Sequence, residues 1–277
     1  MADTHERSLA HWSEAKRRGM EAFYTLATDD YRHLAAALDW RAWLEARQAE
    51  AGDRALHLLD VACGSGKFPT ALTAHADVAR AAIRPVDYAL LDPSSFSLAE
   101  ARQALAPPFV AGRAFETTLQ GFDTQDRSYD IVWATHALYA IPKAELPAAL
   151  ERFLRAIGGR GFIAHAMEAA HYIRFYRLFL DAFRDGGGES YRTAEEIVDG
   201  LGRLGARVEL REIAYDSAAP AAARSVVEGF LQRCAFDDGV TLDQMLDHPL
   251  TGPYLADCHD EHAWRFPQRV GLIFVSP

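Results

Sequence analysis

The chain has 277 residues, of which 49% are hydrophobic, and its formal net charge at pH 7 is −10. This size suits one α/β domain with additions. The acidic balance argues against nucleic acid or an anionic membrane as partner, because phosphate binding needs clustered Lys and Arg, and it favours neutral or cationic partners. With three cysteines, no secretory signal pattern and no run of membrane-spanning length, we expect a cytoplasmic protein.

Helical periodicity marks the first part of the chain. Across residues 8–50, aromatic and aliphatic residues recur at helical spacing among charged ones. We expect residues 1–50 to form an N-terminal helical cap and residues 51–277 to form the main domain. Asp29 and Asp30 precede a helical run, which is typical of a helix N-cap.

The stretch LHLLDVACGSGKF, Leu56 to Phe68, carries the clearest motif. Its apolar start predicts a strand buried on both faces, and Gly64-Ser65-Gly66 predicts a turn that opens a helix. Glycine lets backbone N–H groups approach a ligand closely, and the positive end of the helix dipole points to the same place. Asp60 stands where the strand ends, at the edge where open α/β sheets bind ligands.

Strands and helices alternate through the rest of the chain. Further strands are expected at residues 88–91, 109–114, 129–134, 161–166, 207–215 and 269–275. Ser97-x-x-Glu100 and Thr193-x-x-Glu196 are typical of capping boxes. We expect a helical insertion at about residues 218–265, entered through an Ala/Pro-rich linker at Ala218–Ala223. The alternation predicts a doubly wound, mostly parallel sheet.

The glycine turn separates several ligand classes. Pro69 stands where the dinucleotide fingerprint needs its third glycine, and the absence of Gly-Lys-Ser/Thr excludes a P-loop. A strand, an acid, three residues and Gly-x-Gly together resemble motif I of the class I S-adenosyl-L-methionine (SAM) methyltransferases. A nicotinamide enzyme and a purely structural turn are the alternatives.

The order of motifs over nearly the whole chain resembles that family. The resemblance implies a Rossmann-like, seven-stranded, mostly parallel sheet with a helical cap, whose antiparallel last strand lies between strands five and six. Among subfamilies, the chain looks most like histamine N-methyltransferase and its bacterial relatives. The matching pieces are Leu91–Ser94, Thr135–Tyr139, Tyr191-x-Thr193, Phe230-Leu231-x-x-Cys234-x-Phe236 and Val270–Val275.

SAM is the cofactor that this resemblance implies, with S-adenosyl-L-homocysteine (SAH) as product. Gly64 and Gly66 would face the methionine part, and Asp60 would hold the network near its amino group. Asp92 would accept both ribose hydroxyls, unless it only caps the following helix. The expected cofactor-binding residues are Asp60, Ala62, Gly64, Ser65, Gly66, Asp92, Pro93, Ser94, Thr117, Thr118 and Thr135.

On the acceptor side, His136 and Tyr139 are the expected catalytic residues. His136 would lie in the cleft and take a proton or orient the substrate, with a purely structural histidine as the alternative. The matching family position carries Gln, so the substrate or the proton route is expected to differ from that of histamine methylation.

Other side chains are expected to hold the acceptor. The nearest matches to the family's cap carboxylate and last-strand amide are Asp29, or Asp30, and Gln268. Tyr139, Tyr172, Phe175 and Tyr176 are expected to form an aromatic cage for a cationic or planar substrate, with core packing as the alternative.

These patterns predict SAM-dependent methyl transfer to a small-molecule acceptor, at an amine or ring nitrogen. The chemistry needs a neutral nucleophile aimed at the methyl group in a water-poor cleft. Methylation at oxygen or carbon of a small acid, phenol or heteroaromatic, or a SAM-fold protein without methyl transfer, are the alternatives. We expect no metal, because Cys258–His262 lacks a zinc spacing and is typical of a polar helix surface. A monomer or weak dimer is expected.

Overall fold

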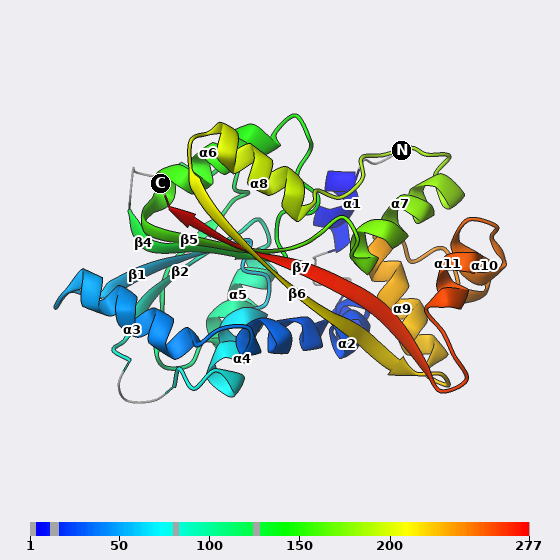
Figure 1. The fold of residues 1–277 in the computed structure, drawn as a ribbon, viewed down its shortest axis with the longest axis horizontal. Helices are drawn as coiled ribbons and strands as arrows, with labels where there is room; N and C mark the ends of the chain where they lie inside the picture. Colours follow the sequence, from blue (N-terminus) through cyan, green and yellow to red (C-terminus); the bar gives the residue numbers. More distant parts are fainter. Residues whose placement is uncertain (1–3, 12–16, 80–82, 124–127, 277) are drawn as a thin grey trace.

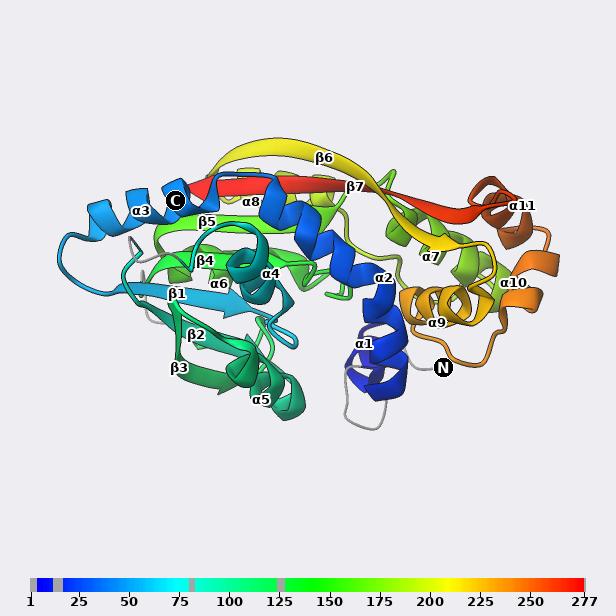
Figure 2. The same cartoon turned by 90° about the horizontal axis from the view of Figure 1, so that it is seen from below.

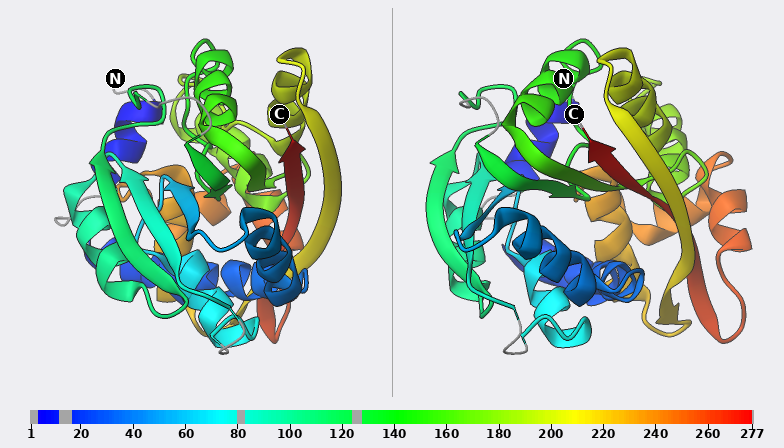
Figure 3. Two further views of the ribbon diagram at one scale, coloured as in Figure 1. Left: turned by 90° about the vertical axis from the view of Figure 1, so that its left-hand side faces the viewer. Right: turned by 60° about the vertical axis from the view of Figure 1, so that its left-hand side comes forward.

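The computed structural model describes residues 4–11, 17–79, 83–123 and 128–276. A twisted sheet of seven strands runs through the molecule, in the order β3-β2-β1-β4-β5-β7-β6 (Figures 1 and 3). β1 to β5 are parallel, and β7 is antiparallel to both of its neighbours, β5 and β6. The expected fold class is therefore confirmed, including the place of the last strand. The strands are β1 (Leu56–Val61), β2 (Val86–Asp92), β3 (Phe109–Glu116), β4 (Tyr129–Thr135), β5 (Ile157–Ala166), β6 (Arg207–Pro220) and β7 (Ala263–Ser276).

Helices cover both faces of this sheet and one of its ends (Figures 1 and 2). α3 and α4 lie on one face, and α6 and α8 lie on the other. α7, α9, α10 and α11 gather at the far end of the β6–β7 hairpin. The helices are α1 (Thr4–His11), α2 (Arg17–Ala36), α3 (Trp40–Ala51), α4 (Lys67–His75), α5 (Ser95–Ala104), α6 (Leu146–Ala156), α7 (His171–Phe183), α8 (Ala194–Arg203), α9 (Arg224–Ala235), α10 (Leu242–Asp247) and α11 (Thr251–Asp257).

The central strands bury both of their faces, as their continuous apolar runs require. Along β4, Ile131 and Trp133 join the core beneath α3 and α4, while Val132 and Ala134 join the core beneath α6 and α8. This alternation follows from the two-residue period of a strand. Because β1 pairs parallel with both β2 and β4, the carboxyl ends of these three strands lie at one edge of the sheet.

A third core lies outside the sheet proper. β6 and β7 pair along their whole length, so their hairpin extends beyond the segment in which β7 pairs with β5. Phe266 of the hairpin packs there against Phe230 of α9, whose ring also contacts Tyr172 of α7. Leu26 of α2 joins the same core, which ties the N-terminal region to this end of the molecule.

Several predicted boundaries were wrong. Ala218–Ala223 is not a linker, because β6 continues to Pro220 by pairing with β7, and the inserted helices span only residues 224–257. Asp29 and Asp30 lie inside α2 and do not cap it. Residues 1–3 and 12–16 of the predicted N-terminal cap lie outside the described residues.

The two predicted capping boxes had different outcomes. Thr193 and Glu196 form one at the start of α8. α5 instead begins one turn earlier than predicted, because the Ser94 side chain accepts a hydrogen bond from the Ser97 N–H. Within the described part of the chain, none of the helices combines the length and the apolar character needed to cross a membrane.

Candidate active site

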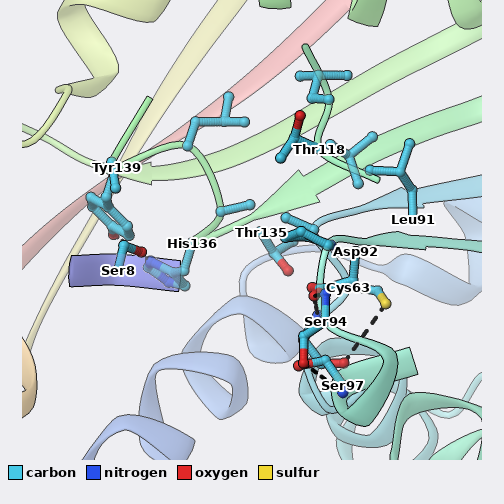
Figure 4. Close-up of a pocket in the computed structure, with 18 of the residues that line it drawn as sticks. Ser8, Cys63, Leu91, Asp92, Ser94, Ser97, Thr118, Thr135, His136 and Tyr139 are labelled. Carbon is cyan, nitrogen blue, oxygen red and sulfur yellow. Dashed lines mark hydrogen bonds between the residues drawn. The ribbon is translucent and has the colours of Figure 1, made fainter. Parts of the chain in front are cut away.

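A cavity of about 570 Å³ opens at the carboxyl ends of β1, β2 and β4 (Figure 4). Its walls come from the glycine turn after β1, the turn after β2 and the end of β4. The edge matches the place where open α/β sheets bind their ligands. Predicted residues that line this cavity are Ala62, Gly64, Ser65, Asp92, Pro93, Ser94, Thr118, Thr135, His136 and Tyr139.

The glycine turn brings its backbone close to the start of α5. Gly64 and Gly66 have φ values of 51° and 70°, which residues with a side chain rarely adopt. A Cβ at Gly66 would also lie 3.2 Å from the Ala101 Cα. Gly66 therefore shapes the turn by packing against α5, whereas Gly64 lines the cavity.

Asp92 joins the turns that follow β1 and β2. One carboxylate oxygen accepts the Gly64 N–H at 3.0 Å, and the other accepts the Ser94 N–H at 2.9 Å. Burial raises the pKa of Asp92, while these two backbone hydrogen bonds oppose that shift. The N-cap of α5 is Ser94, so capping does not explain Asp92. Each oxygen keeps a lone pair for a ligand hydroxyl in the cavity.

Asp60 is buried below this edge. It is 2% exposed, and one of its carboxylate oxygens accepts the Tyr88 hydroxyl at 2.7 Å. Trp133 donates to the same hydroxyl at 3.2 Å, so the carboxylate belongs to a network that links β1, β2 and β4. Burial raises the pKa of Asp60 to about 7. Neither Asp60 nor the predicted Thr117 lines the cavity.

His136 stands where β4 leaves the sheet. Its φ of 53° is in the left-handed region, and its backbone N–H donates to the Ala164 carbonyl at 2.8 Å. The ring nitrogen Nδ1 lies 2.7 Å from the Tyr139 hydroxyl oxygen, and the Tyr31 ring packs edge-on at 5.7 Å. Burial lowers the pKa of His136 to about 4, so the ring is neutral at pH 7.

A second cavity of about 80 Å³ adjoins the first at His136, Tyr139, Tyr31 and Phe236. Its remaining lining residues are Ala27, Asp30, Tyr172, Tyr191, Arg233 and Cys234. These come from α2, α7, α9 and the segment before α8. The cavity is mostly aromatic, and Asp30 places a carboxylate in its wall.

Asp30 is held by side chains. It is 3% exposed and accepts the Tyr172 hydroxyl at 2.6 Å and the Ser217 hydroxyl at 3.4 Å. Gln268 donates to the same Ser217 hydroxyl at 3.3 Å, so it reaches Asp30 only through Ser217. Burial raises the pKa of Asp30 to about 7. Asp29, in contrast, lies on the surface of α2 and pairs with Arg32 at 2.5 Å.

The predicted aromatic cage divides into two groups. Tyr139 and Tyr172 line the second cavity. Phe175 is fully buried in the core, and Tyr176 stacks on Tyr191 at 3.8 Å while it bonds to Thr4 of α1 at 2.9 Å. Phe175 and Tyr176 line neither of the two cavities described above, so core packing accounts for them.

Six residues that line the second cavity were absent from the predicted site: Ala27, Tyr31, Tyr191, Arg233, Cys234 and Phe236. Tyr191 and Phe236 lie in segments that matched the resembled family, which was the available signal. Tyr31 and Arg233 carried none, because their roles depend on how α2 and α9 pack together.

The Cys258–His262 segment is not the helix surface that the sequence predicted. It follows the end of α11, and Asp260 accepts the N–H groups of His262 and Ala263 in a tight turn. Among the residues that the structure describes, no group of three or more His, Cys, Asp or Glu side chains forms a candidate metal site.

Known proteins resemble this chain in one domain model and in the fold. Residues 58–161 match the family model described as a methyltransferase domain. No curated protein matches the chain. The fold is similar to that of magnesium protoporphyrin IX methyltransferase from Synechocystis PCC 6803 with bound SAH, at 12% identity over 97% of both chains and a TM-score of 0.54. It is also similar to that of the plantazolicin methyltransferase BpumL in complex with SAH, at 12% identity over 98% of this chain and 94% of that chain and a TM-score of 0.51.

The molecule is thus an α/β protein with the Rossmann-like methyltransferase fold, and residues 58–161 match the model of a methyltransferase domain. The domain match supports a SAM-dependent methyltransferase with SAM as its cofactor. This confirms the predicted enzyme class. At 12% identity, the two solved structures support the fold and leave the acceptor to be argued from the site itself.

Proposed function

We propose that the enzyme transfers the SAM methyl group to a small molecule that carries a basic nitrogen, bound in the second cavity. The observation that carries this proposal is the buried Asp30 carboxylate in the wall of an aromatic cavity that meets the cofactor cavity at His136. The cofactor itself would occupy the larger cavity, with its ribose at Asp92 and its methionine part along Gly64.

Electrostatics favours a cation beside Asp30. Removal from water disfavours the ionised form of a carboxyl group, so burial raises the pKa of Asp30. A bound ammonium or protonated ring would stabilise the ionised form. The rings of Tyr31, Tyr139 and Tyr172 offer π-faces to the same cation.

The reaction then needs an uncharged nitrogen. Its lone pair forms the new N–C bond as the S–C bond of the sulfonium breaks, and SAH leaves. The proton that the nitrogen gives up passes to Asp30 or to solvent. A carboxyl group whose pKa is near 7 suits this transfer at neutral pH.

Arg233 supports a second candidate. Its guanidinium-bearing side chain lines the same cavity and is 3% exposed. An acceptor with a carboxylate would find a cation there, and methylation of that carboxylate oxygen would follow from the same cofactor geometry. The two candidates differ in which charged side chain the acceptor needs.

The experiment is methyl transfer from isotope-labelled SAM into matched panels of small amines, nitrogen heterocycles, carboxylic acids and phenols. We expect label in basic compounds, and we expect Asp30→Asn to raise the KM of such an acceptor about tenfold or more, as for loss of one charged partner. Asp29→Asn is the matched control and should change neither KM nor SAH affinity. If label appeared only in carboxylic acids and Asp30→Asn stayed fully active, this proposal would be wrong. Methylation of a carboxylate oxygen beside Arg233 would then take its place.

Three further parts of the proposal concern the whole molecule. The N-terminal helices and the inserted helices would together close the acceptor side, because Asp30 of α2 and Arg233 of α9 share one cavity. The acidic net charge of −10 favours a free small molecule over nucleic acid as partner. We propose a cytoplasmic monomer or weak dimer.

A further inference from the structure

Ala166, Tyr139 and His136 form a hydrogen-bond chain. The backbone N–H of Ala166 donates to the Tyr139 hydroxyl oxygen at 3.3 Å. That oxygen also lies 2.7 Å from His136 Nδ1. A buried hydroxyl hydrogen nearly always has an acceptor, and His136 Nδ1 is within reach of it, so we assign Tyr139 as the donor and Nδ1 as the acceptor. Burial raises the pKa of Tyr139, so the hydroxyl keeps that hydrogen at neutral pH.

The position of the remaining ring hydrogen on His136 follows. A neutral imidazole carries one N–H, and Nδ1 is occupied as an acceptor, so the hydrogen is on Nε2. His136 Nε2 is buried and has no hydrogen-bond partner among the described residues. Buried donors nearly always have a partner in a working protein. His136 lines both cavities, so a bound ligand is placed to supply that partner.

The backbone holds the ring in this place. His136 keeps a left-handed φ of 53°, which is uncommon for a residue with a side chain and is often found at functional sites. Its N–H bond to the Ala164 carbonyl anchors the turn to β5. Figure 4 shows His136 beside Tyr139, between the sheet edge and Ser8 of α1.

We propose that Tyr139 fixes His136 as a hydrogen-bond donor to the methyl acceptor, through Nε2–H, and that His136 is not the base of the reaction. The inference rests on the proposed function and narrows its substrate class. The attacking nitrogen directs its lone pair at the methyl group and cannot also accept from Nε2–H. The acceptor must therefore carry a second atom with a lone pair, such as a ring nitrogen or a carbonyl or hydroxyl oxygen.

The tautomer can be measured without knowing the acceptor. We would record the ring ¹⁵N NMR signals of His136 in the full chain with SAH bound, and assign them by their loss in His136→Gln. We expect a protonated Nε2 and an unprotonated Nδ1 in the wild type, and a mixture of tautomers in Tyr139→Phe. Tyr254→Phe, which removes a hydroxyl 2.9 Å from His171 Nδ1 outside both cavities, is the matched control and should leave the His136 signals unchanged. A protonated Nδ1 in the wild type would overturn the proposal.

Kinetics gives a second readout, with the acceptor that the labelling assay identifies. Glutamine keeps an N–H donor but takes no proton, whereas alanine does neither. Loss of one directed donor in a buried site costs about 100-fold in rate, so we expect about this loss in His136→Ala and a recovery to within about tenfold in His136→Gln. Equal inactivity of both variants, with normal SAH affinity, would mark His136 as a base. Failure to label any amine would defeat the proposed function but leave the NMR result interpretable.

Discussion

The cofactor side and the acceptor side of this cleft are built in different ways. On the cofactor side, main-chain turns after β1 and β2 meet, and Asp92 holds them through two backbone N–H groups. On the acceptor side, side chains from α2, β4, α7 and α9 converge from distant parts of the sequence. The cofactor side therefore depends on local turns and the acceptor side on tertiary packing. Substitution of side chains on the acceptor side could therefore change which acceptor binds, while the turns on the cofactor side stay the same.

The two buried carboxylates of the cleft show this contrast. Asp92 is bound by backbone groups of Gly64 and Ser94, whose positions the turns fix. Asp30 is bound by the hydroxyls of Tyr172 and Ser217, which other residues would not supply. Substitutions at Asp92 should thus act on cofactor affinity, and substitutions around Asp30 should act on the acceptor.

The largest expected effect is at Asp92. Asp92→Ala removes the acceptor of two N–H groups and the expected partner of the ribose hydroxyls, at about 1.5–3 kcal/mol for each charged hydrogen bond. We expect SAH affinity, measured by calorimetry, to fall about 100-fold or more. Asp87→Ala, on the same strand with a half-exposed side chain, is the control. An unchanged SAH affinity in Asp92→Ala would remove the basis for assigning the cofactor side.

The sequence signals of the proposed cofactor side are local for the same physical reason, although Asp60, Gly66 and Thr117 do not line the cavity. Apolar runs, an acid at the end of β2 and a Gly-x-Gly turn are local signals, and each one appears in the structure where it was expected. Local signals gave wrong answers where a distant partner decides. Ala218–Pro220 pairs with β7 far along the chain, and Ser94 caps α5 in place of Ser97.

On the acceptor side, sequence patterns could not tell which of two nearby residues lines the cavity. Asp29 and Asp30 are adjacent, yet one faces solvent and the other is buried. Tyr172 and Tyr176 lie one helical turn apart, yet only Tyr172 lines the second cavity. In each pair the choice depends on how α2 and α7 pack, which periodicity alone does not determine.

Asp60 is a third buried carboxylate, and its burial alone should make the stability of the fold depend on pH. The Asp60 pKa is raised from 3.8 to about 7, so between these values the folded state keeps a proton that the unfolded chain releases. Stability is therefore lost as pH rises from about 4 to above 7. We expect Asp60→Asn to reduce this loss between pH 5 and pH 8 by about 2 kcal/mol, measured by urea unfolding. The exposed Asp53→Asn is the control.

The same variant also examines the predicted contact of Asp60 with the cofactor. If Asp60 serves only the Tyr88 and Trp133 network, Asp60→Asn should leave SAH affinity within about threefold of wild type, which is less than one ordinary hydrogen bond. A larger loss would place Asp60 on the cofactor side as a ligand group. In that case Asp60 of β1 would both stabilise the fold and bind the cofactor.

The smallest effect is expected from Tyr172→Phe, which sharpens the contrast within one helix. The change removes the hydroxyl that donates to Asp30 at 2.6 Å and leaves the ring in the cavity wall. Losing this bond, worth about 1 kcal/mol, should raise the acceptor KM about fivefold with SAH affinity unchanged. Tyr176→Phe is the matched control: it loses its bond to Thr4, outside the cavities, and should lower stability without changing the KM. Of these two tyrosines, only Tyr172 bonds to Asp30. Equal KM values in the two variants would therefore show that the Asp30 network does not bind the acceptor.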